Sequence, residues 1–289
     1  MTTLPPLRGR AETLGATLPP LLAQAQHLAA TIILGEHGRR QSGMGDAFWQ
    51  FRPAMAGDSL RRIDWRRSAR GDVPYVRETE WQAAQSVVLW VDGARSMGFS
   101  GARARPPKSD RARLLALALA ILLLRGGERV GLSGGDVPPR SGRAQIDRIA
   151  EGLLDEAADY GAPRPEGLVP HGRAVFLSDF LGDLTALELA LGRAADSGVT
   201  GALVQVLDPA EEEFPFDGRT IFESMGGSLR HETLRAGELR QRYLDRLAER
   251  KEQVQALARV AGWQYECHHT GQGAQAALLW LYRAMERRR

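Results

Sequence analysis

Cysteine is almost absent from this chain, whose 289 residues include only Cys267. A single cysteine excludes an internal disulfide and any zinc site built from several thiolates. Long apolar runs are missing too, because the longest, Leu114–Leu124, has 11 residues, whereas a membrane-spanning helix needs about 20. The first 20 residues contain four prolines and an acid instead of the apolar core of a signal peptide. We therefore expect a cytoplasmic protein without a membrane span.

Nucleotide-binding motifs are also missing. The chain has no GxxxxGK[ST] loop and no GxGxxG segment after a strand, so the usual machinery for nucleotide hydrolysis and dinucleotide binding is absent. Lysine is scarce, since Lys108 and Lys251 are the only two lysines among 38 basic residues. We interpret this arginine bias as genome composition. With 35 acids the formal net charge is only +3, so a basic surface would have to come from local clustering.

Apolar runs alternate with helical patterns after residue 85. Short, nearly continuous apolar runs predict buried parallel strands at 86–91, 129–132, 173–180 and 200–209. Helices are expected at about 109–125, 144–158, 184–196, 233–260 and 274–287. Ser109 or Asp110 is the expected N-cap of the first of these helices. The alternation predicts an α/β fold, namely a doubly wound, mostly parallel, Rossmann-like sheet with right-handed crossovers.

The N-terminal part has a different pattern. Residues 1–83 form the expected N-terminal extension, and residues 84–289 form the expected sheet domain. Within the extension we expect a helix at 20–34 and a glycine-containing loop after it. Aromatic and arginine residues then alternate without a helical period, and VPYVRETEW is the one segment there that reads as a strand.

Two predicted strands end in an aspartate: VVLWVD ends at Asp92 and AVFLSD at Asp179. Ligands of open α/β sheets collect outside the carboxyl ends of the strands, near the point where the strand order reverses. Together with the hydroxyls of Ser96 and Ser178, the two carboxylates would form an oxygen-rich cluster suited to Mg²⁺. Asp208 ends the next strand in the same way. The alternative is that these acids cap the following helices or bind turn amides.

Three segments resemble known families. DGARSM after an apolar strand resembles the first motif of the von Willebrand factor A fold, whose metal-ion-dependent adhesion site begins Asp-x-Ser-x-Ser, and SDF resembles the strand that supplies its second aspartate. FWQFRPAMAGDSLRRIDWRRSARGDVPYVRETE is similar to the signature of domain-of-unknown-function family 58, which precedes a von Willebrand factor A-like domain. AEEEFPFDGRTIFESMGG, followed by an arginine-rich helix and GW, also looks like that family. The resemblance covers roughly residues 30–285.

What the resemblance implies for the metal site is mixed. Asp92 and Ser96 match the first motif, and Asp179 matches the second aspartate. Ala94 stands where the first serine ligand belongs, and alanine has no oxygen to offer. Because Mg²⁺ needs near-octahedral oxygen ligands, the resemblance implies a degenerate site in which Arg95 could place a cation where the ion would lie.

The arginine-rich segment is the second candidate site. Its candidate partner-binding residues are Arg61, Arg62, Asp64, Trp65, Arg66, Ser68 and Arg70. Arginine forks bind phosphates or carboxylates, and an indole offers a stacking surface. The alternative is an internal network in which Asp58 and Asp64 neutralise the arginines and fasten the extension to the sheet domain. Interleaved acids reduce the field on which nucleic-acid binding depends, so nucleic acid is the less favoured ligand.

One further group of metal-ligand residues is Cys267, His268 and His269. Three consecutive side chains on one strand do not converge on a point, so we expect no soft-metal site there.

These observations leave three classes of function. The first is a non-enzymatic protein-interaction scaffold, and the family resemblance implies an association with AAA-type ATPases of the MoxR kind in chaperone-like maturation of other proteins. The second is a metal-dependent phosphoester hydrolase that holds its ion between Asp92 and Asp179. The third is nucleic-acid binding through the arginine-rich segment. No cofactor other than Mg²⁺ is expected.

Overall fold

The chain divides into two compact units. In the computed structural model, the described residues are 19–32, 48–55, 63–69, 71, 73–79, 84–134, 136–154, 161–223 and 230–286. One unit comprises residues 36–84, and the other comprises residues 1–35 together with 85–289.

The larger unit contains a five-stranded sheet with strand order β4-β3-β5-β6-β9. Its strands are β3 (Ser86–Val91), β4 (Arg129–Leu132), β5 (Arg173–Ser178), β6 (Thr200–Leu207) and β9 (Gln264–His269). All neighbouring strands are parallel. A parallel sheet needs cover on both faces, which is why its strands read as continuous apolar runs. The predicted doubly wound, mostly parallel sheet is confirmed.

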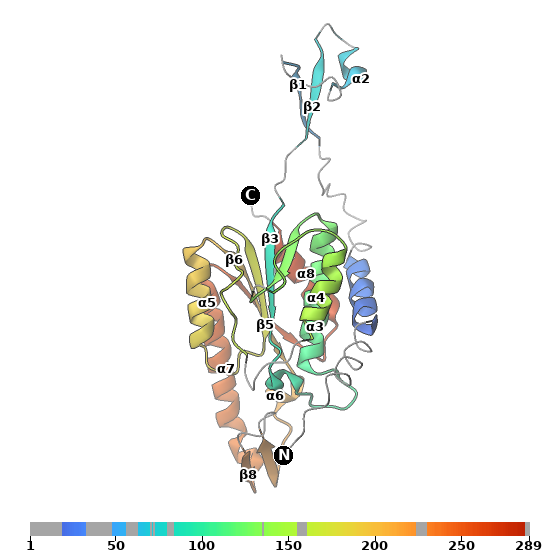
Figure 1. Cartoon of the computed structure of the whole chain (residues 1–289). Helices are drawn as coiled ribbons and strands as arrows, with labels where there is room; N and C mark the ends of the chain where they lie inside the picture. Colours follow the sequence, from blue (N-terminus) through green and yellow to red (C-terminus); the bar gives the residue numbers. More distant parts are fainter. Residues whose placement is uncertain are drawn as a thin grey trace. The chain divides into compact units, whose positions relative to one another are not determined.

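Helices cover both faces of this sheet (Figure 1). One face packs against α3 (Lys108–Arg125), α4 (Ala144–Gly152), α8 (Ala274–Met285) and the helix of residues 19–32. The other face packs against α5 (Thr185–Asp196) and α7 (Ala236–Val260). The longest apolar run of the sequence lies in α3, where residues 115–123 are all buried. A helix that is apolar all round is stable only when it is surrounded, and burial of one leucine side chain contributes about 2 kcal/mol.

The helix of residues 19–32 belongs to the core of the larger unit. Its buried residues Ala25, Ala29 and Ile32 form one apolar stripe and share a cluster with α3. The sequence pattern grouped this helix with the N-terminal extension. The structure differs from that grouping. The two alanines on the stripe allow the helix to pack closely against its neighbours in the core, and local composition does not reveal such packing.

The start of α3 also differs from the prediction. Pro107 is the N-cap and Lys108 is the first helical residue, so the predicted capping by Ser109 or Asp110 is wrong. Pro107 makes no side-chain capping bond. The first turn is held instead by the long-range contacts of the Lys108 side chain, which local capping rules do not consider.

Shorter elements surround the carboxyl ends of the strands. They are η2 (Arg95–Gly98), α6 (Pro209–Glu213), β7 (Thr220–Glu223) and β8 (Arg230–Thr233). The chain leaves β3 for β4 on one side and later returns to β5 on the other. The strand order therefore reverses between β3 and β5, where the ends of these strands form the expected position for a ligand site.

The smaller unit contains an antiparallel pair, β1 (Phe48–Pro53) and β2 (Tyr75–Thr79), and the short helix α2 (Trp65–Ser68). β2 lies within the predicted strand VPYVRETEW. In neither unit does a described helix have the length and apolarity needed to cross a membrane.

Candidate functional site

A buried lysine lies among the acids at the strand ends. Lys108 is 1% exposed, and its Nζ donates to Asp179 Oδ2 at 2.9 Å and to Glu211 Oε1 at 2.7 Å. Burial acts to lower the pKa of Lys108, but the two carboxylates outweigh it and raise the pKa above its ordinary value. The side chain is therefore a fixed cation at the carboxyl end of β5.

Lys108 was not predicted as a site residue. The cation predicted near the strand ends was Arg95, but that residue is exposed on η2. The available signal was the rarity of lysine in an arginine-rich chain. An ammonium is a compact point charge that fits between two carboxylates, whereas a guanidinium is a wide planar fork.

Asp92 is closed off from solvent. Its Oδ1 accepts from the backbone N–H of Ala94 at 2.8 Å, and its Oδ2 accepts from Ser178 Oγ at 2.7 Å. A Cβ atom on Gly161 would lie 2.0 Å from Asp92 Oδ1, so only glycine fits there. Burial, partly offset by these hydrogen bonds, raises the pKa of Asp92. The adjoining cavity of about 10 Å³ is about large enough for one water molecule.

Asp208, at the end of β6, has a capping role. Its Oδ1 accepts from the backbone N–H of Ala210 at 2.9 Å, and Glu211 completes a capping box at the start of α6. Arg105 Nη1 also donates to Oδ1 at 2.7 Å, and Thr270 Oγ1 donates to Oδ2 at 3.1 Å. Burial acts to raise the pKa of Asp208, but these donors outweigh it and lower the pKa. Asp208 therefore caps the following helix, and Asp92 accepts from a turn amide, as the alternative to a metal site predicted.

A Mg²⁺ ion does not fit the residues around Asp92 and Asp179. Ala94 supplies no oxygen, and the Lys108 ammonium holds one oxygen of Asp179. Ser96 Oγ is buried and has no hydrogen-bond partner among the described residues, but this one hydroxyl cannot replace the missing ligands. Mg²⁺ requires several oxygens in octahedral geometry, and a fixed cation nearby repels it. We derive no metal chemistry from this cluster.

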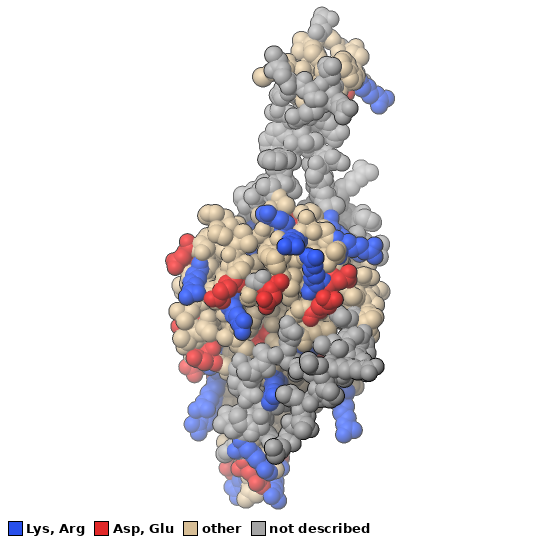
Figure 2. All heavy atoms as spheres, viewed as in Figure 1, with Lys and Arg blue, Asp and Glu red and all other residues tan. Residues whose placement is uncertain are grey.

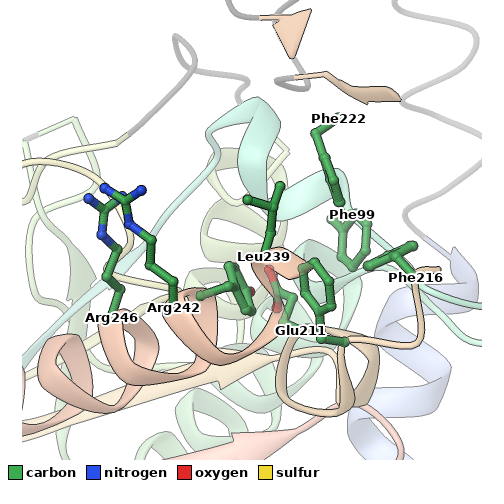
Figure 3. A pocket seen from close by; sticks show the side chains of 9 residues that line it. Phe99, Glu211, Phe216, Phe222, Leu239, Arg242 and Arg246 are labelled. Carbon is green, nitrogen blue, oxygen red and sulfur yellow. The ribbon is translucent and has the colours of Figure 1, made fainter. Parts of the chain in front are cut away.

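Glu211, which accepts a hydrogen bond from Lys108, also lines an aromatic pocket (Figure 3). The pocket has a volume of about 510 Å³. Its lining residues are Phe99, Glu211, Phe214, Phe216, Phe222, Leu239, Arg242, Tyr243 and Arg246. The rings contact one another, with centroids of Phe214 and Tyr243 5.0 Å apart. The volume is that of a typical ligand pocket.

Two arginines form one side of this pocket. Arg242 and Arg246 are exposed on α7, one helical turn apart, and their side chains extend in the same direction in Figure 3. Neither makes an ion pair or a side-chain hydrogen bond within the described part of the chain. Glu211, by contrast, is already paired with Lys108. The pocket thus combines an apolar interior with unpaired positive charge at its edge.

The arginine-rich segment is divided between structural and exposed residues. Asp64 caps α2 by accepting from the backbone N–H of Arg67 at 2.9 Å. Ser68 Oγ donates to the Asp64 carbonyl oxygen at 2.7 Å and accepts from the Tyr75 N–H at 2.8 Å. Trp65 is 62% exposed and Arg66 is also exposed, so these two remain available for a partner. The predicted residues Arg61, Arg62 and Arg70, and Asp58 of the alternative, lie outside the described residues.

Charge on the larger unit is mixed in sign. On the face shown in Figure 2, basic and acidic side chains of the described residues are interspersed. Nucleic-acid binding depends on basic side chains clustered on one face. This face of the described residues does not present such a cluster.

The segment GLSGG, residues 131–135, has the GxSxG pattern of an esterase elbow. Ser133 follows β4, and its Oγ donates to the Arg164 carbonyl oxygen at 2.5 Å. An elbow serine instead requires a sharp strand-to-helix turn and a histidine partner. Within the described ranges, no histidine contacts Ser133, and α4 begins only at Ala144.

Cys267, His268 and His269 lie on β9, as three consecutive strand residues. His268 Nε2 is 3.0 Å from Arg111 Nη1. Cys267 and His269 instead lie close to Glu212 of α6. The three consecutive residues do not converge, but Cys267 and His269 converge with Glu212. This group was not predicted because Glu212 belongs to α6, which is far from β9 in the sequence.

Several known proteins are similar to this chain. Uncharacterized protein Mb1516 of Mycobacterium bovis and Uncharacterized protein Rv1480 of Mycobacterium tuberculosis are each 30% identical to it over 211 residues. Each match covers 66% of this chain and 64% of the relative, so the chain spans less than two thirds of these relatives' length.

Two solved structures cover 70% of this chain. The conserved hypothetical protein BatB from Bacteroides thetaiotaomicron is 12% identical, with 97% of its chain covered and a TM-score of 0.41. An aerotolerance-related membrane protein from Bacteroides fragilis is 15% identical, with 98% covered and a TM-score of 0.42.

The sequence profile described as "Protein of unknown function DUF58" matches residues 50–253. This chain therefore belongs to the DUF58 family.

Proposed function

We propose that this chain is a non-enzymatic protein-interaction scaffold with a von Willebrand factor A-like sheet domain and a degenerate metal-ion-dependent adhesion site. We further propose that its partner is an AAA-type ATPase of the MoxR kind, in chaperone-like maturation of other proteins. The choice of this partner rests on the resemblance to the DUF58 family. The observation that supports a binding role is the aromatic pocket flanked by Arg242 and Arg246, which make no ion pair with any residue that the structure describes.

The pocket has the chemistry of a protein-binding site. Binding energy at protein interfaces concentrates in a few aromatic and arginine residues around well-packed pockets. An apolar side chain of the partner would enter between the rings of Phe214, Phe222 and Tyr243. Arg242 and Arg246 would pair with carboxylates next to that side chain. The partner segment is therefore expected to carry a large apolar residue followed by acidic residues.

The Lys108 cluster supports a binding role that does not use a bound ion at the strand ends. In that cluster a protein ammonium supplies the positive charge next to Asp179. The same ammonium also donates to Glu211 and orients it at the wall of the pocket. We propose that Lys108 fixes the shape of the binding surface and that partner binding through the pocket does not require Mg²⁺ there.

The test is direct binding of the purified full chain to a purified MoxR-type ATPase from the same organism, with ATP, with ADP and without nucleotide. We expect the Arg242→Glu/Arg246→Glu variant to bind at least about tenfold more weakly, a loss of about 1.4 kcal/mol. Arg259→Glu, an exposed residue on the same helix α7, is the matched control and should bind like the wild type.

Two outcomes would overturn separate parts of this proposal. Absence of binding in every nucleotide state would exclude the MoxR-type partner. Binding that Arg242→Glu/Arg246→Glu leaves unchanged would exclude the pocket as the interface. In that second case Arg66→Glu tests whether the exposed residues of α2 form the interface instead.

A further inference from the structure

Three potential metal ligands converge beside β9. Side chains of a strand alternate between its two faces, so Cys267 and His269 share one face. Glu212 of α6 reaches the same place, and one ligand atom from each of the three residues lies within 4.8 Å of the others. Among the described residues, this is the one group of acids, histidines and cysteines with such spacing.

The contact between the histidine and the acid is close but imperfect. His269 Nε2 is buried and lies 2.5 Å from Glu212 Oε2. The contact is an ion pair when the ring is protonated, but this nitrogen makes no hydrogen bond with any described residue. A buried ring nitrogen without a hydrogen bond is costly, and coordination of an ion by both atoms would remove that cost.

The donor atoms are those that zinc prefers. Thiolate sulfur, imidazole nitrogen and carboxylate oxygen are its common protein ligands, and three of them form the usual protein contribution to an open zinc site. Mg²⁺ and Ca²⁺ favour oxygen ligands instead. The carboxylate and the thiolate would together neutralise the ion's two positive charges.

Lys251 of α7 competes for the same atoms. Its Nζ forms an ion pair with Glu212 Oε1, and its positive charge also acts on the Cys267 thiol. The lysine side chain is 31% exposed, and those of Glu212 and His269 are also partly exposed. The ammonium can therefore move into solvent, and an ion can reach the cluster from the surface.

We propose that Glu212, Cys267 and His269 form a zinc-binding site in which the Lys251 ammonium is the competing cation. Burial raises the pKa of the Cys267 thiol, although Lys251 acts in the opposite direction. The thiol is therefore protonated at neutral pH. Binding of Zn²⁺ forms a zinc–sulfur bond, releases one proton from Cys267 to solvent and displaces Lys251 from Glu212.

The test titrates the full chain with Zn²⁺ alone against a chromophoric chelator at pH 7. We expect Cys267→Ala and His269→Gln each to weaken binding at least about tenfold. Lys251→Met should tighten binding several-fold because it removes the competitor. Glu213→Gln, the exposed neighbour on α6, is the matched control and should not change the affinity.

A second measurement reads the sulfur ligand directly. With Co²⁺ in place of Zn²⁺, we expect a thiolate-to-metal absorption band in the wild type and in Lys251→Met, and no such band in Cys267→Ala. Equal zinc affinity of the wild type and Cys267→Ala would overturn the proposal, as would absence of the band from Lys251→Met. The site is independent of the proposed function, because it shares no residue with the aromatic pocket and zinc affinity is measured without any partner protein.

Discussion

The two lysines of this chain make the same kind of contact in two different environments. Lys108 pairs with Glu211, and Lys251 pairs with the next residue, Glu212. Lys108 is 1% exposed, and the side chain of Lys251 is 31% exposed. This difference indicates that burial, and not the ion pair itself, distinguishes a permanent structural cation from one that an incoming ion can replace.

The physical reason is solvation. A buried charge that loses its partner cannot recover its hydration, so breaking a buried pair is strongly unfavourable. A partly exposed ammonium exchanges its carboxylate for water at little cost. The strand-end acids are therefore closed around Lys108, whereas the neighbouring cluster and the aromatic pocket remain open to ligands.

Removal of the two ammonium groups is the strongest test of this comparison. Lys108→Met leaves Asp179 and Glu211 buried without their cation, and we expect it to lower the free energy of unfolding by about 3–5 kcal/mol. Lys251→Met, the matched variant at the exposed pair, should change it by less than about 1 kcal/mol. Urea denaturation at pH 7 measures both values. Equal effects of the two variants would contradict the comparison.

Burial of His268 makes the stability of the protein depend on pH. The pKa of His268 is lowered from 6.5 to about 4, first by burial and then by Arg111. The folded state therefore favours the neutral ring, so its contribution is complete above pH 6.5 and is lost as the pH falls from 6.5 to about 4. The loss amounts to at most about 3 kcal/mol.

The variant His268→Gln keeps a hydrogen-bond acceptor for Arg111 but cannot titrate. We expect its free energy of unfolding to fall less steeply than that of the wild type between pH 7 and pH 4, measured by urea denaturation at several pH values. The control is His27→Gln, an exposed position on the helix of residues 19–32. Identical slopes for His268→Gln and the wild type would show that His268 does not titrate in this window.

The smallest expected effect concerns the closure over Asp92. Gly161→Ala would place a methyl group 2.0 Å from Asp92 Oδ1, and the forced displacement should cost about 1–3 kcal/mol. Gly192→Ala on α5 has open space around the added carbon and should stabilise the helix by up to about 1 kcal/mol. Thermal unfolding of both variants gives the signs. A neutral Gly161→Ala would mean that Asp92 is not tightly covered.

The predictions from sequence succeeded where the signal is local. The run VVLWV became β3 and RVGL became β4 with the expected bounds, because a buried parallel strand needs continuous apolar residues. The strand-end positions of Asp92 and Asp179 follow from the same runs. The predictions failed at β1, α2, α6 and the β7–β8 pair, where the segments are short and carry little periodicity.

The candidate sites were less predictable than the fold. Asp92 and Ser178 were expected in one cluster, and they are hydrogen-bonded. The aromatic pocket was not expected, since Phe99 is separated by more than a hundred residues from the phenylalanines around Phe214. The tertiary arrangement of η2, α6, β7 and α7, rather than any motif, brings these rings together.

The sequence by itself determined how strands β3 to β6 alternate with their helices and that acids lie at the strand ends, since both follow from short-range apolar patterns. Only the tertiary structure decided which cation meets which acid. Lys108 precedes Asp179 by 71 residues and Glu211 by 103, and Lys251 follows Glu212 by 39. Such pairs depend on strand order and on how helices pack across the sheet, and no local pattern encodes either.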